Sequence, residues 1–197
     1  MTTDLIIRKG ETLVRVVRWE ALPYVYSAIT GITQAAPAVV TSAGHGLVTG
    51  WRAAVLSAGG MRQINAKHTP PADSEFRKVT KVDASSINFN EVDSSRYTAY
   101  TSGGFLVSYT PVVLSGYTAR MQIRETVEAT TTLASLVSPT DIVLDDTNHT
   151  ITITIAAVVT AAYDFKTAVY DLELVSGTGV VTRLLEGAVI VSDEVTR

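Results

Sequence analysis

Residues 151–155 read Ile-Thr-Ile-Thr-Ile, and this stretch indicates the fold class most directly. Every side chain in it is β-branched, which restricts χ1 and favours an extended backbone. Apolar and polar residues alternate with a period of two, as in a strand with one buried face. Related patterns occur in FLVSY at 105–109, YDLEL at 170–174 and AVIV at 188–191, the last after a break at Gly187. Short strands of this kind predict an all-β fold, a sandwich or a barrel.

Turn signals separate the predicted strands, as expected for short antiparallel elements. They are Gly59-Gly60, Gly103-Gly104, Asp145-Asp146-Thr147-Asn148 and Ser176-Gly177-Thr178-Gly179. Residues 156–165 are rich in alanine and predict one short helix between two strands, with Thr160 as a candidate cap. Residues 126–137 lack early helix breakers, but their many threonines favour strand or loop.

The composition limits the classes of partner and chemistry. The chain has 197 residues and no cysteine, which excludes disulfides, thiolate metal sites and cysteine nucleophiles. Its net charge is -3, so no nucleic-acid partner is expected. No apolar stretch reaches the roughly 18 residues of a membrane helix, so no membrane association is expected. The absence of cysteine fits folding in a reducing cytoplasm, and the opening residues MTTDL lack the regions of a signal peptide.

The low content of charge favours contacts between subunits. Charged residues make up 18% of the chain, against roughly 25% in ordinary soluble domains, and the mean hydropathy is +0.23. An apolar chain without a membrane segment often covers part of its surface with other subunits. We therefore expect an oligomer within a larger assembly, and a large monomeric core is the alternative.

Glycine and proline are concentrated in the middle of the chain. Residues 27–110 hold eight of the 13 glycines, together with Pro37, Pro70 and Pro71. Residues 1–26 supply at most two strands, too few for a stable sheet, and therefore need partners after residue 110. We predict a discontinuous β-sandwich from residues 1–26 and 111–197, interrupted by a small β-barrel at 27–110.

The flanking segments resemble the N-terminal domains of phage baseplate upper proteins and related tail proteins. The pieces that carry the resemblance are DLIIRKGET at 4–12, Trp19, LSGYTARMQIR at 114–124, YDLEL at 170–174, VTRLLEG at 181–187 and VTR at 195–197. That family usually has a short loop after the Trp strand, whereas residues 27–110 intervene in this chain. The resemblance implies a β-sandwich that attaches receptor-binding proteins to a baseplate.

The intervening segment resembles a small β-barrel module that recurs in phage tail proteins. The module is similar in fold to the first catalytic-cysteine half-domain of ubiquitin-activating enzymes. Its ordered pieces include AVVT at 38–41, GHGLVTG at 44–50, FRKV at 76–79, NF at 88–89 and YTAYTSGG at 97–104. Because the chain has no cysteine, no ubiquitin chemistry is implied.

No pattern of catalytic or metal-ligating residues is complete. The three histidines, His45, His68 and His149, lack the spacing of metal ligands. His45 lies between two glycines, which indicates a tight turn. The acidic turn at 145–148 could suit calcium, but Asx residues favour turns by themselves. We expect no cofactor, no metal and no enzymatic activity, with a small glycosidase as the alternative.

Two sets of residues are candidates for contacts with partners. Terminal strands are able to pair with a neighbour's sheet edge, so we expect subunit contacts at Leu5, Ile7, Val189, Val191 and Val195. Aromatic side chains of the middle segment could form a sugar-binding platform, although aromatics in strands usually belong to a core or an interface. These aromatics are Trp51, Tyr97, Tyr100 and Tyr109.

The expected function is a structural protein of a bacteriophage virion, in the tail or baseplate. Its expected partners are other virion proteins (tail, baseplate, fibre or neck subunits) and further copies of itself. The chain would be made in the cytoplasm of the host bacterium and would act as an assembly or fibre-attachment adaptor. The alternative function is a carbohydrate- or receptor-binding module of a tail protein.

Overall fold

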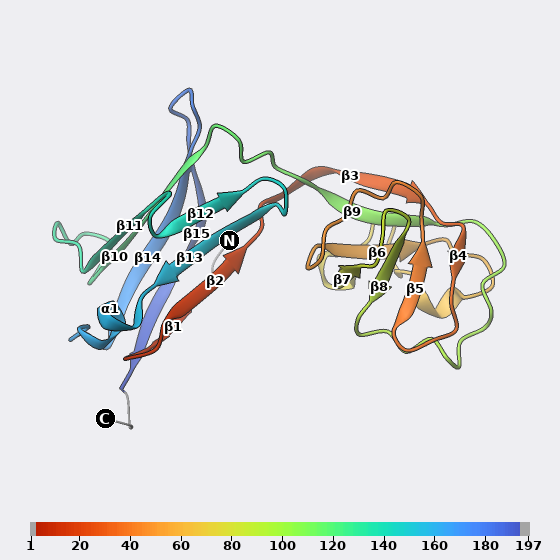
Figure 1. Cartoon of the computed structure of the whole chain (residues 1–197), viewed down its shortest axis with the longest axis horizontal. Coiled ribbons are helices and arrows are strands. Elements are labelled where there is room, and N and C mark those ends of the chain that lie inside the picture. The colour runs from red at the N-terminus through yellow and green to blue at the C-terminus, as the bar shows by residue number, and fades with distance from the viewer. Residues whose placement is uncertain (1–2, 194–197) are drawn as a thin grey trace. The chain divides into compact units, whose positions relative to one another are not determined.

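A computed structural model of the chain describes residues 3–193 and has an all-β fold (Figure 1). It divides into two compact units. The host domain contains the described residues up to Trp19 and those from Val113 onward, and the inserted domain contains Glu20–Val112. Both boundaries differ from the expected ones, because strand β3 (Glu20–Ala28) pairs with β9 (Phe105–Pro111) inside the inserted domain.

The host domain consists of two sheets, which Figure 1 labels. The five-stranded sheet has the order β1 (Leu5–Arg8), β15 (Val181–Ser192), β14 (Thr167–Val175), β10 (Thr118–Arg124) and β11 (Ala134–Val137). The three-stranded sheet has the order β12 (Ile142–Asp145), β13 (Thr150–Ile155) and β2 (Leu13–Val17). Only the β1–β15 pair is parallel among the pairs of the described strands.

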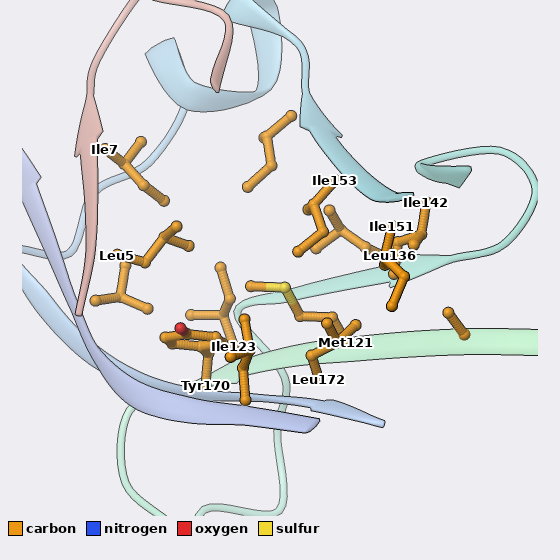
Figure 2. Close-up of a cluster of buried hydrophobic side chains, with 14 of the residues drawn as sticks. Leu5, Ile7, Met121, Ile123, Leu136, Ile142, Ile151, Ile153, Tyr170 and Leu172 are labelled. Atoms are coloured by element: carbon orange, nitrogen blue, oxygen red, sulfur yellow. The ribbon is translucent and has the colours of Figure 1, made fainter. Parts of the chain in front are cut away.

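One apolar core lies between these two sheets, as in a β-sandwich (Figure 2). The smaller sheet contributes Ile142, Ile151 and Ile153, and the larger sheet contributes residues such as Met121 and Leu172. The alternation at 151–155 is confirmed, since its three isoleucines are buried and its threonines are not. Burial of apolar surface, at about 25 cal/mol per Å², is therefore the main stabilising term of this domain.

The short helix expected at 156–165 is present as α1 (Ala157–Ala161). Thr160 does not cap it. Its buried hydroxyl lies inside the helix and donates to the backbone oxygens of Glu11 and Ala157. The hydroxyl of Thr12 accepts a hydrogen bond from the Ala157 amide. The first helical amide is therefore satisfied by a residue far away in the sequence.

The N-terminal strand is part of the host core, which corrects the expected interface. Leu5 is aligned with Val189 and Ile7 with Val191, and all four side chains are buried in the core. Because the side-chain period of a strand is two, the alternate residues Ile6 and Ile190 face outward instead. Val195, the fifth expected contact, lies outside the described residues.

Gly187 does not break a strand, since β15 runs through it. An added Cβ at this position would lie 2.3 Å from the backbone oxygen of Thr3. The Thr3 amide also donates to the Glu186 oxygen. The glycine therefore allows the N-terminal segment to approach β15 closely.

The inserted domain contains one curled seven-stranded sheet. Its order is β3, β9, β6 (Arg52–Leu56), β7 (Arg77–Lys81), β8 (Ser86–Phe89), β5 (Ala38–Thr41) and β4 (Gly31–Ile32). The two ends of this order, β3 and β4, are separated in the chain only by residues 29–30. The Ile29 amide donates to Gly104 beside β9, and the Thr30 amide donates to Thr41 of β5. The sheet therefore curls until one continuous segment contributes to both of its ends.

The loops of the inserted domain carry two short 3-10 helices, η1 (Arg62–Ile64) and η2 (Asp73–Glu75). The main core is formed around Trp51, Phe89 and Ile87, with Leu106 from β9. Gly60 is required between two loops, because its φ is +76° and an added Cβ would lie 2.2 Å from the Ala99 oxygen. No helix within residues 3–193 is long and apolar enough to span a membrane.

Candidate functional site

Three of the four candidate sugar-binding aromatics serve the fold of the inserted domain, which corrects the expected platform. Trp51 is buried, and its indole N–H donates to the backbone oxygen of Tyr109. Tyr100 donates its hydroxyl to the backbone oxygens of Ile29 and Gly103. The ring of Tyr109 packs against Tyr24 and Phe76. These aromatics therefore do not form one exposed surface.

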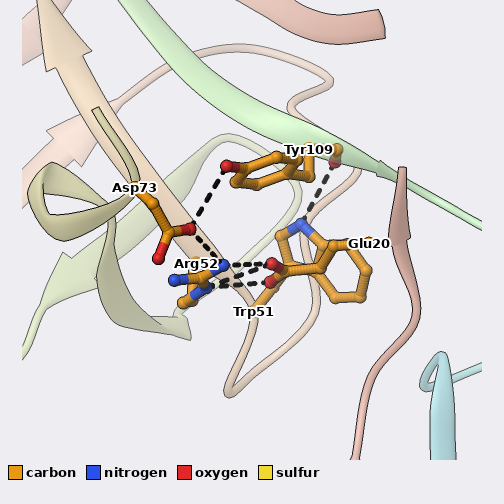
Figure 3. A network of polar contacts seen from close by, with 5 residues as sticks. All are labelled: Glu20, Trp51, Arg52, Asp73 and Tyr109. Carbon is orange, nitrogen blue, oxygen red and sulfur yellow. Dashed lines mark hydrogen bonds and ion pairs between the residues drawn. The ribbon is translucent and has the colours of Figure 1, made fainter. Parts of the chain in front are cut away.

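A polar network surrounds Tyr109 (Figure 3). The guanidinium of Arg52 donates to both oxygens of Glu20, with 3.0 Å between Nε and Oε1, and also contacts Asp73 at 2.9 Å. Tyr109 donates its hydroxyl to the same Asp73 oxygen, and Arg52 lies over the tyrosine ring at 5.5 Å. The network joins the first residue of β3 to β6, β9 and η2, so its role is to hold elements together.

The pKa values in this network follow from its contacts. Hydrogen bonding to Glu20 raises the pKa of Arg52 further above its ordinary value. The Arg52 guanidinium lowers the pKa of Asp73, and burial is the main cause that raises the pKa of Tyr109. All three groups therefore keep their ordinary charge state near neutral pH.

Tyr97, the fourth expected aromatic, lines a cavity of about 410 Å³ on the inserted domain. The other lining residues come from η1 and the segment after it, from η2 and the start of β7, and from Val92. They are Gln63, Ile64, Asn65, Ala66, Lys67, His68, Ser74, Glu75, Arg77 and Val92. The cavity is thus built mainly from one loop region, residues 63–77, and closed by residues near Tyr97.

Glu75 holds the loop that forms one wall of this cavity. Its Oε1 accepts the Lys67 amide, and its Oε2 accepts the Ala72 amide at 2.8 Å and lies 3.1 Å from the His68 Nδ1. These contacts, the Lys67 amide first, lower the pKa of Glu75 to about 2. The carboxylate therefore stays charged at neutral pH and fixes both ends of the segment 67–72.

Several donors in the cavity lining are left for a ligand. Within residues 3–193, the Lys67 ammonium and the Ser74 and Tyr97 hydroxyls have no side-chain or backbone partner. Arg77 has one distant contact, 3.9 Å from Glu91, and both of these side chains are at least half exposed. Such an exposed pair is worth little energetically, so Arg77 is also available to a ligand.

A second cavity, of about 450 Å³, lies on the outer face of the larger host sheet and has a different character. Its polar side chains are bonded to one another. Arg124 donates to Gln122 and to the Ala129 oxygen, and Arg183 contacts Asp171 and Glu186. This cavity therefore offers fewer groups to a polar ligand.

The outer face of the smaller host sheet is apolar and uncharged at its centre. Val143, Thr152 and Val16 are aligned across its three strands, and Val14 is aligned with Thr154. The exposed fraction is 58% for Val14, 49% for Val16 and 51% for Val143. We call these five residues the valine face. An exposed apolar surface of this kind is suited to contact with another protein.

The remaining candidates from the sequence are local turns. His45 is buried between Gly44 and Gly46, which both have positive φ, and its ring bonds to the Leu47 amide and the Asp83 oxygen. In the acidic turn, Asp145 accepts the amide and side-chain N–H of Asn148, which lowers the pKa of Asp145. Within the described residues, no cluster of three His, Asp or Glu side chains is arranged to hold a metal ion.

No protein-family model and no curated protein sequence matches the chain.

The cavity residues Lys67, Glu75 and Arg77 were missed by reasoning from the sequence. They follow no ligand-binding pattern, and only the fold brings residues 63–77 next to Tyr97. One local signal did exist. Glu75 is the third residue of η2, after Ala72, which is the position from which a glutamate bonds back to the amide before a helix.

Proposed function

We propose that this chain is a non-enzymatic structural component of a bacteriophage virion, acting in the tail or baseplate as an assembly or fibre-attachment adaptor. The observation that carries the proposal is the valine face of the host domain. The resemblance of the flanking segments to baseplate upper-protein domains supports the same function. The partners are other virion proteins and further copies of the chain.

The mechanism of the adaptor is association. A partner that covers the valine face removes Val14, Val16 and Val143 from water. Because these side chains are about half exposed, each contributes about 1 kcal/mol of transfer free energy when covered. Unpaired backbone groups along edge strand β2 add directional hydrogen bonds to a partner strand.

The test is to find the chain in purified particles and then to remove it by one substitution. Antibodies against the chain should label the tail of particles from the phage that encodes it, at a constant ratio to the other tail proteins. Val16→Lys should abolish its incorporation, because the lysine charge would be buried against the partner. The melting temperature of the purified variant should stay unchanged, since Val16 is exposed.

Val158→Lys is the matched control, because Val158 is 77% exposed on α1, outside the valine face. It should be incorporated normally. Absence of the chain from purified particles would reject the virion proposal. Equal incorporation of both variants would reject the valine face as the contact.

A second candidate function, a carbohydrate- or receptor-binding module, is favoured by the cavity beside Tyr97. An aromatic ring next to unpaired donors is an arrangement that protein sites use for polar ring compounds. In this case the host domain attaches the chain, and the inserted domain presents the site.

A further inference from the structure

The cavity on the inserted domain has the size for one small ligand. Its volume of about 410 Å³ falls within the roughly 300–1,000 Å³ typical of ligand sites. Ile64 and Val92 supply apolar surface, and the remaining lining is mostly polar. A single sugar ring with its hydroxyl groups matches this volume and this mixture.

Tyr97 is held firmly enough to act as a surface for such a ring. Its ring packs against the core of the inserted domain. Its amide donates to the Ser94 oxygen, and its own backbone oxygen accepts the Gln34 side-chain amide at 2.6 Å. Ser94 is itself buried and donates to the oxygens of Thr33 and Ala35. The aromatic side chain is therefore already oriented before a ligand binds, which lowers the entropy cost of binding.

The charges of the lining favour an anion. Lys67 and Arg77 contribute two positive charges, and Glu75 contributes one negative charge. The Glu75 carboxylate opposes an anion, but hydrogen bonds from two backbone amides and from His68 already stabilise it. Lys67 has no acceptor within the described chain, and Arg77 has only its distant contact with Glu91. A ligand carboxylate would give both cations a strong acceptor.

The same contacts disfavour a phosphate. Phosphate sites in proteins commonly use several backbone amides of one loop. Here the amides of Lys67 and Ala72 are already bonded to Glu75. A carboxylate, which needs fewer donors, is the better match to the side chains that remain.

We infer that this cavity binds an acidic saccharide, a pyranose ring that carries a carboxylate. The ring packs on Tyr97, and the carboxylate lies between Lys67 and Arg77. This inference deepens the second candidate function and rests on it. It is independent of whether the chain occurs in a virion.

The experiment measures binding of D-glucuronate, D-glucose and inorganic phosphate to the full chain by NMR titration. D-Glucuronate should shift the amide signals of Lys67, Arg77 and Tyr97, with a dissociation constant in about the millimolar range for one sugar ring. D-Glucose should bind at least about tenfold more weakly, because it lacks the carboxylate. Phosphate should bind at least about tenfold more weakly, because it cannot pack on the ring.

Two variants and one control identify the site. Lys67→Gln and Tyr97→Leu should each weaken D-glucuronate binding about tenfold, through the lost charge and the lost aromatic surface. Lys78→Gln removes a charge from the neighbouring exposed position of β7, which does not line the cavity. This control should change the affinity by less than about twofold. Unchanged amide spectra away from the cavity will confirm that the variants fold.

Three results would overturn the inference. They are the absence of D-glucuronate binding, equal binding of D-glucose or phosphate, and equal weakening by the Lys78→Gln control. Antibody labelling of particles tests the virion proposal separately, so the two failures are distinguishable.

Discussion

The two domains of this chain reach stability by different means. The host domain has one core in which buried residues alternate along long paired strands, such as the run of β14 through Ala168, Tyr170, Leu172 and Leu174. In the inserted domain, polar side chains attach the loops to the sheet. Buried Ser94 bonds to the segment before β5, and Asn65 bonds to both the amide and the oxygen of Ala58.

Because of this difference, the two domains should be sensitive to different kinds of substitution. A core of alternating apolar residues is sensitive to lost volume, because neighbouring side chains relax only partly around a cavity. A domain of fixed loops is sensitive to backbone geometry and to unpaired polar groups. The inserted domain also has the cavity with unpaired donors, which fits the general role of loops in binding.

The largest expected effect comes from Leu172→Ala in the host core. Leu172 is fully buried, so the substitution should lower the free energy of unfolding of the host domain by about 3–5 kcal/mol. The two cores share no residue, so the inserted domain should unfold as before. Calorimetry should therefore show one shifted transition and one unshifted transition.

Fluorescence can assign the two transitions. The chain has two tryptophans, Trp19 in the host domain and Trp51 in the inserted domain. In a Trp19→Phe background, the Trp51 signal should be insensitive to Leu172→Ala. An equal shift of both transitions would mean that the domains unfold as one unit, and the comparison would fail.

A smaller effect is expected from Gly60→Ala in the inserted domain. The new Cβ would meet the Ala99 oxygen at 2.2 Å, and the positive φ adds strain of about 1–2 kcal/mol. Together these should lower the free energy of unfolding of the inserted domain by about 3 kcal/mol, as followed by the fluorescence of Trp51. Gly103→Ala is the matched control, since its φ of +68° is similar and no atom lies within 4 Å of its Cβ.

The control variant should lower the free energy of unfolding only by the backbone strain, about 1 kcal/mol, as measured by chemical denaturation. Equal losses for both variants would show that the close approach of the two loops does not limit the stability of the inserted domain.

The smallest effect is the acid response of the inserted domain. The pKa of Glu75 is about 2 in the folded chain, against an ordinary value of 4.5. Its contribution to stability is therefore complete above about pH 4.5 and is lost as the pH falls toward 2. Glu75→Gln should remove that part of the acid response, measured as the Trp51 unfolding midpoint between pH 5 and 2. An unchanged acid response in the variant would contradict the role of Glu75 in holding the loop.

Much of the fold followed from local patterns. The alternation at 151–155 predicted both the strand and its buried face, and the turns at 145–148 and 176–179 occur where the sequence indicated them. The interface prediction at Leu5 and Val189 was wrong for a specific reason. A period of two indicates that one face of a strand is buried. It does not indicate whether that face is covered by the chain's own core or by a partner subunit.

The candidate site depended on long-range contacts. The sequence grouped Tyr97 with Trp51 and Tyr109 as candidate sugar-binding aromatics. Residue type alone does not indicate which of these rings the fold buries. Glu75 and Lys67 had no pattern that pointed to a ligand. Their arrangement depends on a loop whose two ends are bonded to one carboxylate.

The sequence by itself determined the all-β class, the strand faces and most turns, because these depend on alternation and on local backbone preferences. The tertiary structure alone decided three things: which apolar strands share a core, where the host domain gives way to the inserted one, and which polar groups keep no partner. Each of these depends on contacts between residues far apart in the chain, such as Leu5 with Val189 and Glu20 with Arg52. Local patterns carry no information about such pairings.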